Sequence, residues 1–97
     1  MATYIMLGNF TDQGIRNIKD TAKRAEAFKG LAKKVGATVQ SQYWTLGQYD
    51  IALIVDAPDD AAMTSLALSA GALGNVRTHL MRAFTPDEIG PIIGRMV

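Results

Sequence analysis

A short polar segment between two extended stretches is the feature that most constrains how this chain can fold. Leu46 to Asp50 separates a stretch rich in aromatic and β-branched residues from the apolar run Ile51 to Val55. Gly47 and Gln48 can reverse the chain there, because glycine adopts the backbone conformations that tight turns require. The segment therefore predicts a hairpin of two antiparallel strands, residues 37–46 and 49–55, the second of which enters the core.

The segments around this hairpin alternate between strand and helix patterns. Residues 3–9 and 76–84 alternate in hydropathy and predict a first and a last strand. Thr11 and Asp12 are candidate helix N-caps, and from residue 21 apolar residues recur at helical spacing until Gly36, a left-handed cap. Proline and aspartates at 58–60 start a second helix, which ends near Leu73 before Gly74.

The end of the chain carries its own helix signal. Thr85, Pro86 and Glu88 form the pattern of a capping box with proline at the first helical position. We therefore predict a short terminal helix. We expect it to bury Ile89, Ile92 and Ile93.

The order strand, helix, strand, strand, helix, strand, with a tail helix, predicts an α+β fold of the ferredoxin-like βαββαβ type, with residues 1–97 as a single domain. In this fold both helices cover one face of the sheet. The first and third strands nevertheless carry apolar side chains on both faces: Tyr4 and Met6 oppose Ile5 and Leu7, and Ala52 and Ile54 oppose Ile51, Leu53 and Val55. An open apolar face of this size usually forms an interface, so we expect a homodimer or a larger even-numbered oligomer that uses the sheet face.

Composition narrows the classes of function. The chain has no cysteine, which excludes disulfides and a cysteine nucleophile and favours a reducing compartment. No signal peptide or membrane span is recognisable, so we expect a cytoplasmic, soluble protein. The first 36 residues hold three acidic side chains and seven basic ones, which are five lysines together with Arg16 and Arg24. Because no aromatic residues interleave with these lysines and no nucleic-acid motif is present, we interpret them as a solvated helix face rather than a nucleic-acid site.

Three segments together resemble a known family. They are the opening residues 3–11, the Gly47-Gln48-Tyr49-Asp50 turn with its strand and the following residues 57–60, and residues 73–85 around the last strand. They are similar to the GYD-domain family of small bacterial and archaeal proteins, named for the Gly-x-Tyr-Asp turn. The resemblance implies a dimeric α+β barrel. It transfers no catalytic residue, because the family has no established mechanism. Ala22 departs from the proline that we expect in many relatives.

Candidate ligand-binding residues lie in or near the predicted strands. Tyr49 and Asp50 can present a phenol and a carboxylate at the sheet edge, and a carboxylate can serve as a general base. The simpler alternative is structural: aspartate beside a turn accepts backbone hydrogen bonds, and tyrosine packs across neighbouring strands. We favour the structural alternative.

His79 is the only histidine and is predicted to share a face with Arg77. It can act as an acid or base near neutral pH, or as a single axial haem ligand by analogy with related folds. No second histidine or suitably spaced carboxylate accompanies it, so we predict no metal site and no cofactor. A structural or solvent-exposed role is favoured.

Tyr4 and Arg77, if they share a sheet face, can surround a cavity for a small planar or carboxylate-bearing ligand. Tyr43 and Trp44 are further candidates. In the alternative, the aromatic residues fill a dimer core and Arg77 pairs with an acid such as Asp50.

Two functions remain open. The first is an oligomeric module that binds a small molecule or assembles with other proteins. The second is a cofactor-independent isomerase or monooxygenase acting on a small aromatic or lactone-like substrate. A deep pocket that joins His79, Arg77 and a tyrosine favours the enzyme, whereas a filled barrel favours the module.

Overall fold

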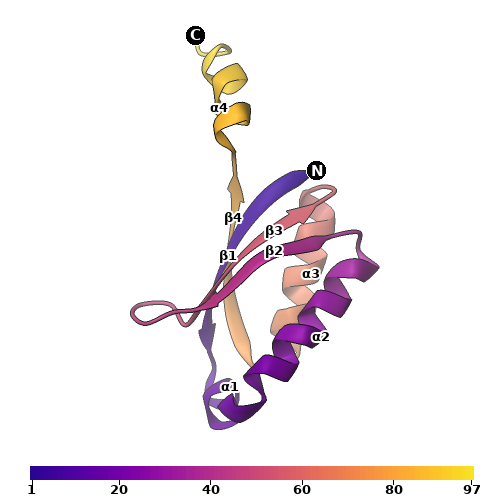
Figure 1. The fold of residues 1–97 in the computed structure, drawn as a ribbon, viewed down its shortest axis with the longest axis vertical. Helices are drawn as coiled ribbons and strands as arrows, with labels where there is room; N and C mark the ends of the chain where they lie inside the picture. Colours follow the sequence, from indigo (N-terminus) through magenta and orange to yellow (C-terminus); the bar gives the residue numbers. More distant parts are fainter.

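The computed structural model describes all 97 residues and confirms the ferredoxin-like fold (Figure 1). In chain order the elements are β1 (Ala2–Phe10), α1 (Asp12–Arg16), the 3-10 helix η1 (Ile18–Asp20), α2 (Thr21–Lys34), β2 (Thr38–Trp44), β3 (Ile51–Ala57), α3 (Asp60–Ala72), β4 (Val76–Ala83) and α4 (Pro86–Ile93). The strands form one sheet in the order β2-β3-β1-β4, with each neighbouring pair antiparallel. This order is that of the split βαβ arrangement.

The register of β1 with its two neighbours assigns every side chain to a face. Tyr4 lies opposite Val55 on β3 and Arg82 on β4, and Met6 lies opposite Leu53. Because side chains alternate along a strand, these residues share the face on which α2 and α3 pack. The alternation predicted from the sequence is therefore confirmed for β1, β3 and β4.

The core lies between this face and the two helices. Its largest fully buried side chains are Met6, Leu53, Val55, Met63 and Leu66. Burial of each such side chain contributes about 1.5–3 kcal/mol before the entropy cost of ordering the chain. The sheet and the helices α2 and α3 thus form two layers, and the opposite face of the sheet, which we call the open face, has no helix over it (Figure 1).

The chain between β1 and α2 forms two short elements of its own, α1 and η1, which the sequence did not separate from the main helix. Thr11, one of the two candidate caps, is the N-cap of α1 and accepts a hydrogen bond from the Gly14 N–H at 3.1 Å. α1 passes close to the turn after α3: a Cβ atom at Gly14 would lie 2.0 Å from the Asn75 carbonyl oxygen. Glycine at this position therefore permits a close backbone approach that no other residue allows.

The β2–β3 hairpin has a longer connection than predicted. β3 begins at Ile51 rather than at residue 49, and residues 45–50 form the loop. Gly47 has a φ of +131°, which agrees with its predicted role in the turn. A bulge between Val39 and Ser41 shifts the register of β2 against β3.

The predicted burial of the terminal helix is wrong. α4 forms with the predicted capping box, but Ile89, Ile92 and Ile93 are 41%, 40% and 57% exposed. The helix projects from the end of β4, away from the two layers (Figure 1). Its contacts with the body include an ion pair between Arg82 and Glu88 at 3.6 Å. The three isoleucines form an apolar stripe on this helix, but nothing in the chain itself covers the stripe.

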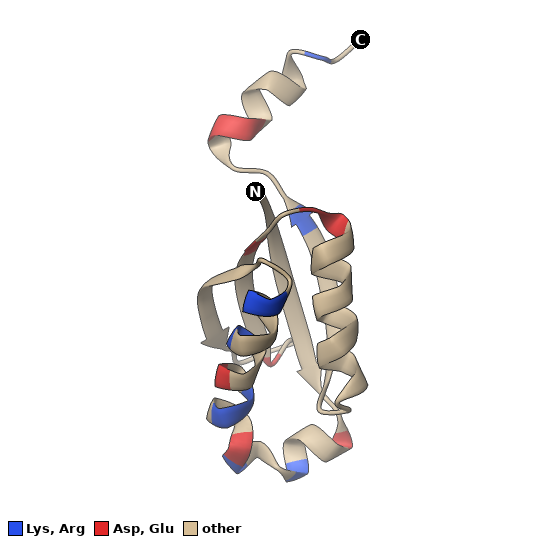
Figure 2. Ribbon diagram, turned by 90° about the vertical axis from the view of Figure 1, so that its right-hand side faces the viewer, with Lys and Arg blue, Asp and Glu red and all other residues tan.

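Charge is distributed unevenly between the two packed helices (Figure 2). α2 carries Lys23, Arg24, Lys29, Lys33 and Lys34, whereas Asp60 is the only charged residue of α3. Beyond Asp60, the exposed side of α3 therefore carries no charge, and it includes Leu68 at 68% exposure beside Ser65 and Ser69.

Candidate functional site

The open face carries a band of apolar side chains across the neighbouring strands β3, β1 and β4. They are Ile5 and Leu7 on β1, Ala52 and Ile54 on β3, and Met81 on β4. Ile54 is 39% and Met81 44% exposed, although both occupy strand positions inside a regular sheet. Exposed apolar patches of this kind mark interaction surfaces in soluble proteins.

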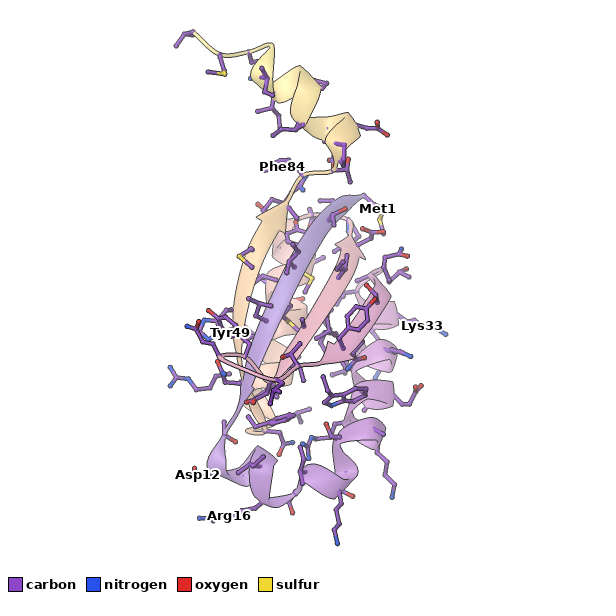
Figure 3. The ribbon with its side chains drawn as sticks, turned by 60° about the vertical axis from the view of Figure 1, so that its left-hand side comes forward. Met1, Asp12, Arg16, Lys33, Tyr49 and Phe84 are labelled. Carbon is purple, nitrogen blue, oxygen red and sulfur yellow. The ribbon has the colours of Figure 1, made fainter.

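Polar candidates gather at one end of this band. His79 lies opposite Leu7 on the sheet, and Arg77 lies opposite Asn9 two residues nearer the end. The β2–β3 loop brings Tyr49 to β4 (Figure 3). The Tyr49 ring meets that of His79 edge to face, with centroids 5.4 Å apart. The structure thus brings Tyr49 against His79, and Arg77 lies two residues along β4 from His79, on the same face of the sheet.

Asp50 has a structural role, because both its side chain and its backbone form hydrogen bonds with the backbone of β1. Its carboxylate accepts a hydrogen bond from the Phe10 N–H at 2.9 Å, and its own N–H donates to the Gly8 carbonyl oxygen at 2.9 Å. Asn9 adds a third link by donating from Nδ2 to the Gln48 carbonyl oxygen at 2.8 Å. These bonds fasten the turn to the end of β1, as the structural alternative for Asp50 predicts.

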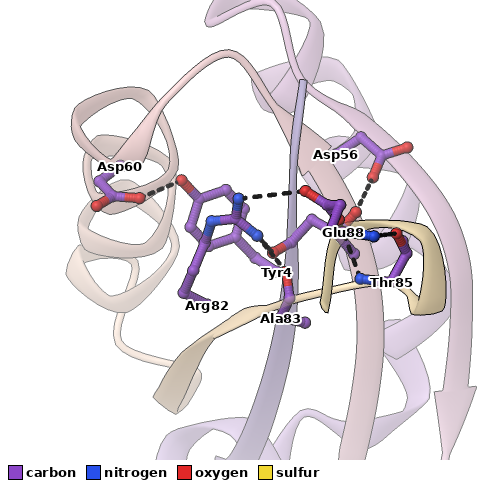
Figure 4. A network of polar contacts seen from close by, with 8 residues as sticks. Tyr4, Asp56, Asp60, Arg82, Ala83, Thr85 and Glu88 are labelled. Atoms are coloured by element: carbon purple, nitrogen blue, oxygen red, sulfur yellow. Dashed lines mark hydrogen bonds and ion pairs between the residues drawn. The ribbon is translucent and has the colours of Figure 1, made fainter. Parts of the chain in front are cut away.

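Tyr4 and Arg77 lie on opposite faces of the sheet, so the cavity that depended on their sharing a face does not exist. Tyr4 is 2% exposed, on the helix side, and its hydroxyl donates to the Asp60 carboxylate (Figure 4). Burial, followed by this hydrogen bond, raises the pKa of Tyr4 to about 12. The pairing of Arg77 with Asp50 is also wrong, because Arg77 makes no ion pair and Asp50 is bonded to the backbone.

Arg82 is the cation that does accompany Tyr4. Its guanidinium lies 5.6 Å from the centroid of the Tyr4 ring and 4.5 Å from that of Phe84. It also donates to the Thr3 carbonyl oxygen at 3.2 Å and pairs with Glu88 (Figure 4). This network holds the last residues of β4 and the start of α4, so Tyr4 and Arg82 have a structural role.

Tyr43 and Trp44 point to different sides of β2. Tyr43 lies opposite Ala52, on the open face, and is 60% exposed. Trp44 lies opposite Ile51, on the helix side, where its indole N–H donates to the Thr21 hydroxyl at 3.0 Å. Trp44 is therefore not part of the open face.

Sequence reasoning missed a cavity on the helix side. It has a volume of about 70 Å³ and lies between α2, the end of α3 and the sheet. Arg24, Phe28 and Leu31 all line it. Their spacing of four and three residues is the signal that could have placed Arg24 on the apolar stripe of α2 rather than with the solvated lysines.

The structure contains no group of three His, Asp or Glu side chains close enough to hold a metal ion. No helix reaches the length and hydrophobicity that crossing a membrane requires. The polar end of the open face offers an imidazole, a phenol and a guanidinium, which can bind a ligand or transfer a proton but include no activated nucleophile.

Solved structures support the fold. TTHA0845 from Thermus thermophilus has a TM-score of 0.56 at 21% sequence identity, over 88% of this chain and 95% of that one. FFRP-DM1 has a TM-score of 0.61 at 16% identity, over 87% of this chain and all of the other. At these identities the similarity concerns the fold alone.

Sequence comparison is more specific. The chain is 32% identical over 90 residues to a Thermus thermophilus protein named "Glutamine synthetase and cystathionine beta-lyase binding protein", covering 92% of this chain and 95% of that protein. The family model of the GYD domain matches residues 4–93. The predicted resemblance is thereby confirmed, and the chain belongs to the GYD-domain family.

Proposed function

We propose that this protein is a non-catalytic binding module that self-associates through the open face and docks onto an enzyme. The observation that carries the proposal is the uncovered apolar band formed by Ile5, Leu7, Ala52, Ile54 and Met81. A second copy can cover this band by packing sheet to sheet, because a two-fold axis makes the same patch serve both subunits. We further propose a cytoplasmic location, which the absence of cysteine favours.

An enzyme as partner is supported by the relative from Thermus thermophilus, whose name describes it as binding two enzymes. The surface that we assign to such a partner is α4. Its exposed Ile89, Ile92 and Ile93 recur at spacings of three and one residues, which gathers them on one side of the helix, and exposed Met96 follows shortly after the helix ends. An amphipathic helix of this kind binds by laying its apolar side into a groove of the partner.

Self-association is tested by the variant Ile54→Lys. Light scattering coupled to size exclusion should give an even-numbered oligomer for the wild type and a monomer for Ile54→Lys, with circular dichroism unchanged, because residue 54 does not face the helices. Leu68→Lys on α3 is the matched control, because it also replaces an exposed aliphatic side chain with lysine but lies away from the open face. It should keep the mass of the wild-type oligomer. A monomeric wild type, or an Ile54→Lys protein with the wild-type mass, contradicts the proposal.

Docking is tested with purified glutamine synthetase from the source organism. Surface plasmon resonance should detect binding of the wild-type protein and a loss of about tenfold or more in affinity for Ile92→Lys, because a charge then enters the apolar side of α4. Lys33→Glu, on the exposed side of α2, should bind as the wild type does. Equal affinities for wild type and Ile92→Lys would exclude α4 as the docking surface.

A second candidate function is a cofactor-independent isomerase or monooxygenase acting on a small aromatic or lactone-like substrate. The observation that favours it is the meeting of Tyr49 and His79 beside Arg77, at the end of a face that self-association would enclose. In this case any activity found for the purified protein should disappear in His79→Ala. Full activity in that variant would exclude an acid, base or haem-ligand role for the histidine.

A further inference from the structure

The cavity on the helix side has a buried apolar floor, and its lining also includes four half-buried polar side chains, those of Thr21, Arg24, Gln42 and Asn75. Met6, Phe28 and Leu53 line it and are 2%, 8% and 2% exposed. Trp44 and Leu73 also line it and are 50% and 61% exposed, which places them where the cavity meets solvent. The cavity is therefore shaped to take an apolar group from outside, with its polar contacts near the entrance.

Arg24 is held rigidly at this cavity. Its guanidinium donates to the Asn17 carbonyl oxygen at 2.8 Å and to the Gly14 carbonyl oxygen at 3.2 Å, and lies 6.0 Å from the centroid of the Phe10 ring. These contacts fix its orientation but do not neutralise it, because no carboxylate of the chain forms an ion pair with Arg24. A fixed guanidinium with unused N–H groups is suited to bind a carboxylate.

We propose that this cavity binds a small carboxylic acid with a compact, branched aliphatic tail. The carboxylate of the ligand pairs with Arg24, and its tail enters the cavity and contacts Phe28 and Leu53. This site lies on the helix side of the sheet, so it is independent of the open face and of the docking of α4.

The volume of the cavity sets the size of the tail. A cavity of about 150 Å³ lined by apolar side chains binds benzene. The 70 Å³ found here is about half of that volume. It therefore accommodates about three carbon atoms, which is the branched end of an isobutyl group with its methylene at the entrance, whereas a longer chain or an aromatic ring does not fit without rearrangement.

Trp44 provides a built-in reporter, since it is the only tryptophan and it lines the cavity. We would titrate the wild-type protein with sodium isovalerate at constant ionic strength and follow tryptophan fluorescence. We expect the fluorescence to change and then saturate as isovalerate is added. The affinity for isovaleramide, which has the same shape without the charge, should be lower by about tenfold or more. Acetate, which has the charge without the tail, should also bind more weakly by about tenfold.

Variants of the cation Arg24 and of the apolar cavity wall complete the test. Arg24→Gln should weaken isovalerate binding by about tenfold or more, whereas the matched control Arg16→Gln, which removes a charge from exposed α1, should leave it unchanged. Ala70→Leu should block the tail by filling the cavity, because Ala70 lines it and is 8% exposed. Cooperative thermal unfolding verifies that each variant is folded.

Two results would overturn the proposal. One is the absence of a saturable response to isovalerate. The other is equal binding of isovalerate and isovaleramide to the wild-type protein, a comparison that requires no variant to fold. In either case Arg24 serves only to hold the turn between α1 and α2.

Discussion

The Asp50 carboxylate takes the place of a strand partner for the backbone N–H of Phe10. Pairing of β1 with β3 ends at Gly8 opposite Ile51, before β1 itself ends at Phe10. The side chain of Asp50 supplies the missing acceptor at 2.9 Å. The aspartate of the Gly-x-Tyr-Asp turn thus completes the hydrogen bonding of β1. This contact gives a structural reason for an aspartate directly after the tyrosine.

We expect Asp50→Ala to lower the free energy of unfolding by about 1–3 kcal/mol, because the half-buried Phe10 N–H loses its acceptor. Asp50→Asn keeps an acceptor oxygen and should lose less. Urea denaturation monitored by circular dichroism measures both changes. An Asp50→Ala protein as stable as the wild type would show that the hydrogen bond contributes nothing, and would return Asp50 to the candidates for ligand binding.

The parts of this fold that were predictable from the sequence are those that depend on local patterns. The alternation of Tyr4 with Ile5 correctly predicts which residues of β1 share a face, because the period of a strand requires no knowledge of its neighbours. It does not predict which of the two faces meets the helices. Thr11 was recognised as a candidate cap, but α1 was not separated from α2, because its five residues are too few to display a helical period.

The site was less predictable because its contacts join distant segments. Tyr49 meets His79 only through the path of the β2–β3 loop, which no local pattern reveals. The helix α4 is predicted correctly, but the burial of its isoleucines is predicted wrongly, because apolar residues in a helix do not reveal what covers them. Arg24 was grouped with the lysines of α2 by its charge, although its spacing from Phe28 places it on the packed side.

Gly14→Ala should be among the most destabilising single-methyl additions to this chain. The new Cβ would lie 2.0 Å from the Asn75 carbonyl oxygen, so α1 or the turn after α3 must move. Overpacking of this kind costs about 1–3 kcal/mol. Gly30→Ala is the matched control, because nothing lies within 4 Å of its added Cβ and alanine favours the helix. Thermal unfolding should show a lower midpoint for Gly14→Ala and an equal or higher one for Gly30→Ala; the opposite order would refute the close contact.

Tyr4 makes stability depend on pH in the alkaline range. Its folded-state pKa of about 12 lies above the ordinary value of 10.0, because burial and the bond to Asp60 favour the protonated phenol. The stabilisation is therefore complete below pH 10.0 and is lost as the pH rises from there towards about 12. Tyr4→Phe should lower stability at neutral pH by about 1–2 kcal/mol and flatten this alkaline decline. Urea denaturation of both proteins across this pH range is the measurement, and equal slopes would exclude Tyr4 as the titrating group.

The capping box of α4 should control the tail helix without affecting the rest of the fold. The Thr85 hydroxyl accepts from the Glu88 N–H, and the Glu88 carboxylate accepts from the Thr85 N–H at 3.0 Å, which lowers the pKa of Glu88. The carboxylate therefore supports the helix above its usual pKa of 4.5, and this support is lost as the pH falls below that value.

Since no core packing holds α4, removal of about 1 kcal/mol of capping energy by Thr85→Ala should unfold the helix in a large fraction of molecules. Backbone chemical shifts of residues 86–93 report the loss of helix, and thermal unfolding reports the sheet and its two helices. We expect the shifts to move towards random-coil values while the unfolding midpoint stays the same. A midpoint that falls with the helix would mean that α4 is packed in solution, and because this chain offers it no covering surface, the packing would have to come from a second copy.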